Sequence, residues 1–426
     1  MPNQTYSVRS GDRLTYIAAR FYGDGNKASY IVDSNPQLAN RDKSAEGYPI
    51  IYVGDILNIP ALINKPKDPS KLDSKDPTEI KIMIGGKPFS VWETASIKRS
   101  FDVVADSFTI GGPWNPNEFV DRETFRPFTY PDFSLYIGGE KIMSGIIVNH
   151  DPETSADKNK ITISGYSRPG ILADVPLPLS MYPFEANGLN LKQIIEKCCA
   201  PYGIQVEYNA DTGPAFTDND KIDIEPGQII YDYLIGLVRQ RGVVLSSDVQ
   251  GNLLVQTANI GDPVETIIAG QPPFVKSGVN YNGQARHSSY TAIGTEAIRG
   301  EGKSATIEDN ILKALGIQRP LIFDAKDTNS GSLKEAATAQ YGRSLAESSS
   351  FNVTVQGWRR PSDNQLRKDN ETIIYQNAGD MIYQPTLFLI RDVEYTRSPD
   401  GELTELNIVF PECYNGQIRS SYPWDE

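Results

Sequence analysis

The chain has 426 residues and a formal net charge of −13 at pH 7. Its 39% hydrophobic content, with 22 Tyr, 35 Gly and 29 Pro, suits about two to four β-rich domains with packed cores. The acidic balance argues against a duplex-binding surface, because affinity for phosphate comes from Lys and Arg. The sequence has no 18-residue apolar window and no N-terminal secretory signal, so we expect no membrane-spanning segment.

The first sixty residues predict the order strand, helix, helix, strand. Asp12 stands where an N-cap acceptor is needed, and the first helix places four apolar residues on one face: Leu14, Ile17, Ala18 and Phe21. A second helix should end at Asn35-Pro36, because proline cannot continue it. Ile56, Leu57 and Ile59 form the last strand, which Pro60 ends.

Residues 1–60 resemble a LysM domain, a family that usually binds N-acetylglucosamine-containing glycans such as peptidoglycan. The resemblance rests on Tyr6–Leu14, Phe21–Asp24 and Val53–Pro60. In the family, the glycan lies between the first strand–helix turn and the loop before the last strand. Carried over, this implies a glycan site made of Gly11, Asp12, Arg13, Leu14, Tyr52, Val53 and Gly54.

Two departures from the family pattern keep a second interpretation open. The segment Gln37–Pro49 is longer and more charged than the usual connection, and Val53-Gly54 stands where Pro-Gly is common. The module is therefore either a glycan binder or a LysM fold that packs against neighbouring protein subunits.

Residues 61–79 are predicted to be a linker. The stretch from Lys65 to Pro77 alternates charges, contains three prolines and has a single leucine, so it should be extended and form no core. Positive and negative charges balance through Glu79, and the whole excess of −13 therefore lies in residues 80–426.

Residues 80–170 predict a first small β-barrel or sandwich domain. Glycine pairs at Gly85-Gly86 and Gly138-Gly139 mark two hairpin turns. Alternating or apolar runs predict strands at 80–84, 96–101, 106–110, 133–137, 141–148 and 160–166.

In residues 171–260 the spacing of apolar residues changes from that of strands to that of helices, which predicts an α/β insertion. Asn190 and Gln193 form a capping box before a helix whose apolar stripe includes Cys198 and Cys199, so we expect both thiols to be buried. A second helix is expected over 226–241 with Gly242 at its C′ position, followed by a hairpin within 243–256.

Residues 261–426 predict a second barrel-like domain with further C-terminal strands. One helix is expected after a capping box at Ser332–Glu335, with Leu333, Ala337, Tyr341 and Leu345 on one face. Strands are predicted at 352–358, 380–383, 387–390 and 403–411. The overall expectation is an α+β, mainly β protein.

The order of several segments is similar to that in tail baseplate hub proteins of Mu-like phages and contractile injection systems. The likeness spans roughly 340 residues and is carried by Ser96–Ser100, Asp106–Ile110, Lys141–Val148, Ile163–Ser167, Leu191–Tyr208, Phe351–Trp358, Ile390–Tyr395 and Leu406–Pro411. The shorter Mu-type hubs lack the N-terminal module.

This resemblance implies a structural hub without catalytic residues, cofactors or metals. Such hubs are homotrimers whose two barrel-like domains per subunit form a pseudo-sixfold ring below the tail tube protein and above the central spike protein. DNA passes through the ring without specific binding, and an acidic wall suits that passage, although acidity also serves solubility. The expected place is the virion tail baseplate, assembled in the host cytoplasm. The expected partners are other baseplate subunits or, for a glycan-binding module, peptidoglycan.

A peptidoglycan-binding wall hydrolase is the alternative. A zinc site needs clustered ligands, yet His150 and His287 stand far apart in sequence. The three cysteines suggest neither a disulfide framework nor a nucleophile, and we expect a chain folded in a reducing compartment. The sequence does not exclude a pair of catalytic carboxylates of the kind that glycosidases use.

Overall fold

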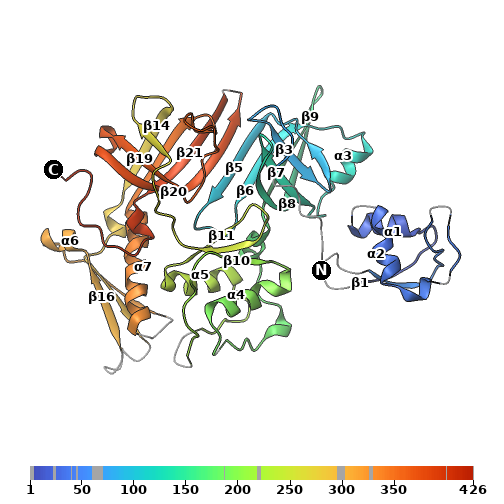
Figure 1. Ribbon diagram of the computed structural model, residues 1–426, viewed down its shortest axis with the longest axis horizontal. Coiled ribbons are helices and arrows are strands. Elements are labelled where there is room, and N and C mark those ends of the chain that lie inside the picture. The colour runs from blue at the N-terminus through green and yellow to red at the C-terminus, as the bar shows by residue number, and fades with distance from the viewer. Residues whose placement is uncertain are drawn as a thin grey trace.

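The computed structural model describes residues 4–22, 25–39, 41–44, 47–59, 71–186, 188–217, 222–294, 303–325, 330–399 and 401–425. Strands make up 38% of it and helices 23%, so the mainly β expectation is confirmed. Figure 1 shows a large sheet above smaller α/β units, with the N-terminal unit to one side.

The N-terminal unit has the predicted order of elements. These are β1 (Gln4–Ser7), α1 (Leu14–Tyr22), α2 (Ala28–Asp33) and β2 (Ile56–Ile59), with β1 antiparallel to β2. Asn35 is fully buried after α2, and its side chain ties that helix to β2. The Asn35 amide donates to the carbonyl oxygens of Ile31 (2.6 Å) and Asn58 (2.7 Å), and it accepts the N–H of Asn58 at 2.7 Å.

The large sheet contains strands from both halves of the body. The first half supplies β3 (Ile80–Ile84), β4 (Lys87–Phe89), β5 (Thr94–Ser100), β6 (Ser107–Pro113), β7 (Asp132–Ile137), β8 (Glu140–Thr154) and β9 (Asn159–Ser167). The second half supplies β13 (Glu265–Ile268), β14 (Phe274–Tyr281), β18 (Ser349–Gln356), β19 (Thr372–Asn377), β20 (Ile382–Ser398) and β21 (Gly401–Val409). The short helix α3 (Phe119–Thr124) lies in the loop between β6 and β7.

Among the described strands, one pair joins these two halves. The main path of the sheet runs β14-β18-β21-β20-β5-β6-β9-β8-β7-β3-β4, and β5 pairs antiparallel with β20 from Ser100↔Asp392 to Ala95↔Arg397. The thirteen strands named above form one sheet, and two barrel-like domains remain the expectation for its two halves. The division into domains at 80, 171 and 261 stays a prediction.

The end of the predicted linker is bound to the body. Residues 71–79, here called the strap, cross the β7–β8 turn, where the N–H of Leu72 donates to the carbonyl of Gly139 at 2.7 Å. On the other half of the body, Nε of Arg359 donates to the carbonyl of Pro77 at 3.2 Å. None of the strap side chains is buried, yet its backbone groups have fixed partners on the body, which the linker prediction did not include. The range 60–70 lies outside the described residues.

The insertion contains two helices and a small sheet. Helix α4 (Leu191–Cys199) has the predicted capping box of Asn190 and Gln193, and α5 (Ile230–Val238) follows. The sheet has the order β10 (Val206–Tyr208), β12 (Leu253–Gln256), β11 (Val244–Ser247). Helix α5 begins later than predicted, because Gly227 has a φ of +84°, which a right-handed helix does not accommodate. Gly242 adopts the predicted left-handed conformation after the short helix η6 (Arg239–Arg241).

The second half carries a further sheet under a long helix. This sheet has the order β16 (Ser304–Glu308), β15 (Ser289–Ile293), β17 (Pro320–Asp324), with α6 (Asn310–Ala314) before β17. Helix α7 (Ser330–Ser348) buries the four predicted stripe residues. The capping box at Ser332 is wrong, because helical structure already includes Ser330. The predicted strand at Asp380 is interrupted by η9 (Ala378–Asp380) and by Met381, whose φ is +61°.

Candidate functional site

The two predicted glycan loops lie side by side in the N-terminal unit. The N–H of Gly54 donates to the carbonyl of Val8, and the N–H of Val8 donates to the carbonyl of Asp55, both at 2.9 Å. Gly11 and Gly54 have φ values of +88° and +92°, which favour glycine at both turns. The two loops that the family pattern implied are therefore neighbours in the structure.

Asp12 organises the first loop. Its carboxylate accepts hydrogen bonds from the Tyr6 hydroxyl and from the N–H of Arg9, both at 2.7 Å. The hydrogen bond to Asp12 also raises the pKa of Tyr6 above its usual value. The carboxylate thus holds β1 to the turn before α1 and helps to shape the surface of the site.

Asp55 organises the second loop. Its carboxylate accepts the N–H of Tyr52 at 2.8 Å and forms an ion pair with Arg41. The Arg41 guanidinium, followed by the Tyr52 N–H, lowers the pKa of Asp55. The guanidinium carbon of Arg41 also lies 5.0 Å from the ring centroid of Tyr52, a cation–π contact that holds the ring at the surface.

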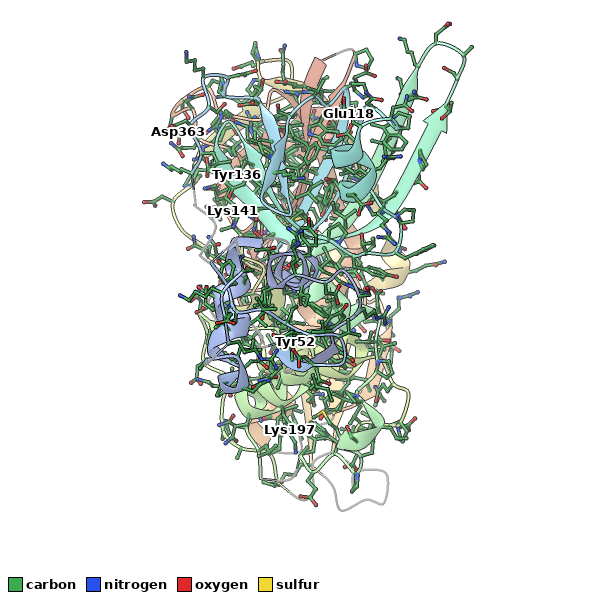
Figure 2. The ribbon with its side chains drawn as sticks, turned by 90° about the vertical axis from the view of Figure 1, so that its right-hand side faces the viewer. Tyr52, Glu118, Tyr136, Lys141, Lys197 and Asp363 are labelled. Carbon is green, nitrogen blue, oxygen red and sulfur yellow. The ribbon has the colours of Figure 1, made fainter. Side chains whose placement is uncertain are left out.

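Exposure divides the predicted site residues into two groups. Tyr52 and Val53 are 60% and 70% exposed, and Figure 2 labels Tyr52 on the N-terminal unit that faces the viewer. Leu14 is only 3% exposed and belongs to the core, so its side chain is not available to a ligand. The helix period explains this correction, because Leu14 opens the buried face of α1.

Sequence reasoning missed two side chains at this surface. Tyr16 is 59% exposed on the outer face of α1, and the guanidinium of Arg13 lies 5.5 Å from its ring centroid. Arg41 was missed because it follows η2 (Pro36–Leu38) in a segment without periodicity. An aromatic residue on the polar face of a predicted helix was the available signal for Tyr16.

The body contains three buried thiols and two partly exposed imidazoles. All three cysteines are buried, and burial raises the pKa of Cys198 to about 12, which opposes thiolate formation. Burial lowers the pKa of both His150 and His287. Within the described ranges, His, Cys, Asp and Glu form no group of three that could hold a metal ion. The same ranges include no helix long and apolar enough to cross a membrane.

A buried charge cluster lies where the two halves of the large sheet meet. Nε of Arg99, on β5, is 3.2 Å from Asp369 and 3.6 Å from Asp106, and its Nη1 donates to the carbonyl of Ile142 at 3.1 Å. Burial raises the pKa of Asp106 to about 7, and the Arg99 guanidinium opposes that shift. Residues from three separate parts of the chain thus depend on one cation.

Two family models match consecutive parts of the body. Residues 79–167 match the N-terminal domain of the Mu phage baseplate assembly protein GpP-like family. Residues 177–257 match the second domain of the baseplate hub protein gp44-like family.

One relative extends this match over most of the body. Baseplate hub protein gp44 of Escherichia phage Mu is 24% identical over 349 residues, which cover 79% of this chain and 88% of gp44. The chain is a homologue of the Mu baseplate hub protein gp44. This homology supports a structural role in a baseplate hub, and it confirms the likeness that the order of segments predicted.

Solved structures of tail proteins show the same fold. The 43 kDa tail protein of prophage MuSo2 from Shewanella oneidensis is 25% identical with a TM-score of 0.65, over 79% of this chain and 99% of that one. A tail protein from Neisseria meningitidis MC58 is 21% identical with a TM-score of 0.67, over 80% and 98%. About a fifth of this gp44 homologue therefore has no counterpart in either tail protein.

Proposed function

We propose that this gp44 homologue forms a homotrimeric hub that joins the tail tube protein to the central spike protein. The single observation that carries the proposal is the relationship to gp44, which extends over 88% of that hub protein. The two halves of the large sheet add support, because three copies of a two-part subunit would present six similar units to a sixfold tube. The β5–β20 pairing would hold the two parts together within each subunit.

We further propose that the hub lines a conduit for DNA in the virion tail baseplate, after assembly in the host cytoplasm. The excess of 13 negative charges in residues 80–426 supports passage without binding, because an acidic wall repels phosphate. The buried thiols and the relatives named as baseplate and tail proteins favour this role over a wall hydrolase.

Particle shape and activity test the hub proposal directly. Light scattering on the purified chain should give the mass of three copies, and electron microscopy should show a threefold ring. A stable monomer at all concentrations would contradict the hub. Clearing of a suspension of purified cell wall by the chain alone would favour the hydrolase instead.

For the N-terminal unit, we propose a LysM-like module whose two loops bind peptidoglycan. Tyr52 and Tyr16 offer exposed rings, the kind of surface that stacks on sugar rings, and the hydrogen bonds of Asp12 and Asp55 hold both loops in place. Docking of the same loops against neighbouring baseplate subunits is the second candidate, because Val53 adds an exposed apolar side chain.

Co-sedimentation with insoluble peptidoglycan distinguishes these two candidates. Tyr52→Ala should lose most binding, whereas Tyr30→Ala, which removes a 48% exposed ring from α2 outside both loops, should keep it. Equal loss in both variants, or no binding by the unaltered chain, would argue against a glycan site. Leu14 should not be altered in this test, since its burial would confuse loss of binding with loss of fold.

A further inference from the structure

The two halves of the large sheet repeat the same order of strand pairing. In the first half the neighbours run β3-β7-β8-β9-β6-β5, and in the second half they run β13-β19-β20-β21-β18-β14. The six strands of each half also follow one another in the same order along the chain. One pair differs in direction, because β3 is antiparallel to β7 while β13 is parallel to β19. The halves are therefore repeats, with β8 in the place of β20 and β14 in the place of β5.

The registers extend this correspondence to single residues. In β8 the pairing with β9 shifts directly after Ile147, and in β20 the pairing with β21 shifts directly after Ile390. Residues 149–154 of β8 thus correspond to residues 392–397 of β20. Equivalent residues, first half before second half, are Ile147 and Ile390, Phe108 and Phe351, and Ile97 and Val279.

Inside the chain, the outer part of β20 covers β5. Residues 392–397, beyond the register shift, pair antiparallel with β5, and the carbonyl of Arg391 accepts the N–H of Phe101 at 2.8 Å. At this contact Tyr395 of β20 is 1% exposed and Ile97 of β5 is 0% exposed. The chain therefore shows how one half of the sheet covers the edge strand of the next half.

The two surfaces equivalent to this contact have no strand partner in the part of the chain that the structure describes. Strand β14 pairs there only with β18, and five of its eight residues are exposed. Residues 149–154 of β8 pair there only with β9, and all of them except His150 are exposed. Figure 2 shows the end of the β8–β9 hairpin projecting beyond the rest of the body.

These two uncovered surfaces differ from each other and lie on opposite sides of the body. Figure 1 places β14 on the left and the β8–β9 hairpin on the right of the large sheet. A contact between two different surfaces joins one copy to the next head to tail, and such contacts generate a ring where the rotation closes. Three copies would then contain six half-units, each joined to the next through equivalent strands.

We propose that residues 149–154 of β8 pair antiparallel with β14 of a second copy of this chain, in the register of the β5–β20 contact. The inference rests on the proposed hub function and names the surface through which the subunits associate. Transfer of the internal register, in which Glu394 lies opposite Lys98, places Asp151 opposite Asn280 of the partner subunit.

Pro152 makes this contact weaker than the internal one. It occupies the place of Tyr395, whose backbone faces β5, because backbone groups alternate along a strand and the Arg391 carbonyl already faces that side. Proline has no N–H, so Pro152 would offer only its carbonyl to Val279 of the partner subunit. We therefore expect two subunits to separate more easily than the two halves of one chain.

Engineered cysteines test the register. In Asp151→Cys/Asn280→Cys the two exposed positions would lie directly opposite each other, with Cβ atoms about 4.5–5.5 Å apart, which is close to disulfide geometry. Oxidised glutathione should convert the assembled protein to covalent trimers on a non-reducing gel, and the three natural cysteines are buried. Asp151→Cys/Lys276→Cys is the matched control, because its second thiol lies four residues along the same face of β14, about 14 Å away, and should not cross-link.

Light scattering on the reduced variants separates this contact from the hub proposal. Three-copy assembly with cross-linking in the Asn280 variant alone supports both. Trimers in which that variant cross-links no faster than the Lys276 control would overturn the strand pairing and leave the hub intact. In the unaltered chain, the amide of Val279 should exchange about tenfold more slowly in the trimer than in diluted monomer, and equal exchange would also overturn the pairing. A chain that stays monomeric at all concentrations would overturn both proposals.

Discussion

The N-terminal unit and the body use charge in opposite ways. Arg41 and Asp55 pair at the surface of the unit, with side chains 24% and 20% exposed. In the body, Arg99 is 14% exposed, and its partners Asp106 and Asp369 are 1% and 8% exposed. A surface pair contributes little to stability, whereas removing one member of a buried cluster leaves the remaining charges unpaired. We therefore expect the loops of the unit to tolerate substitution better than the junction of the two sheet halves.

The hydrophobic core of the N-terminal unit is also much smaller than that of the body. Among the described residues of the N-terminal unit, ten apolar side chains form a buried core, from Tyr6 to Ile59. The largest core of the body draws on both halves of the sheet and includes Trp358, Phe388 and Tyr395. A core of ten residues gives a small domain modest stability. We therefore expect two unfolding transitions, and all four tryptophans, Trp92, Trp114, Trp358 and Trp424, report on the body alone.

The largest expected effect is that of Arg99→Met. The variant leaves Asp106 and Asp369 buried without a cation, which should cost the body about 3–5 kcal/mol of unfolding free energy. Chemical denaturation followed by tryptophan fluorescence measures the loss. A cost below about 1 kcal/mol would mean that the junction does not depend on this cation, and the contrast with the N-terminal unit would fail.

The pH dependence of the body should follow Asp106. Burial raises its pKa from 3.8 to about 7, so the folded body holds this proton more tightly than the unfolded chain does. The stability that comes from the proton is complete below about pH 4 and is lost as the pH rises through 7. Asp106→Asn should therefore flatten the decline between pH 5 and 8, which has a size on the order of 1–3 kcal/mol. An unchanged slope in the variant would assign the decline to other groups.

Gly139→Ala should release the strap from the body. A Cβ at this position would lie 2.1 Å from the carbonyl oxygen of Leu72, and φ is +80°. Gly86→Ala is a matched control, because its φ is +82° and a Cβ there meets nothing within 4 Å. Backbone strain alone should cost each variant about 1 kcal/mol. Only Gly139→Ala should speed tryptic cleavage after Lys71 and Lys75. Equal cleavage in both variants would show that the contact between Leu72 and Gly139 does not hold the strap on the body.

Local periodicity explains what the sequence could predict. Three expectations depend on neighbours within a few residues, and the structure confirms them: the capping box of Asn190 and Gln193, the buried stripe of α7 and the hairpin turn at Gly85-Gly86. Only the start of α7 differs, because that helix already includes Ser330. The two loops of the candidate glycan site followed from the family pattern. Whether those loops bind glycan stays a prediction.

Long-range pairing explains what the sequence could not predict. Strand β20 pairs with β5 across nearly 300 positions of sequence, as the hydrogen bond from Ser100 to Asp392 shows. No local pattern connects these strands, so the sequence did not predict their pairing. The strap was missed for the same reason, because the groups that bind Leu72 and Pro77 belong to Gly139 and Arg359. The backbone N–H and carbonyl groups of a linker carry no sequence signal.

The smallest expected effect is that of Arg41→Met, the counterpart of Arg99→Met in the N-terminal unit. The Asp55 carboxylate would lose its ion pair but remain hydrated and keep the N–H of Tyr52, so the unit should stay folded. Hydrogen exchange of peptides from residues 4–59 should change only around Tyr52, where the cation–π contact disappears, and the body should be unaffected. Global loss of protection across α1 and β2 would show that a surface ion pair supports this small core as strongly as Arg99 supports the junction, and the difference between the two regions would then lie in size alone.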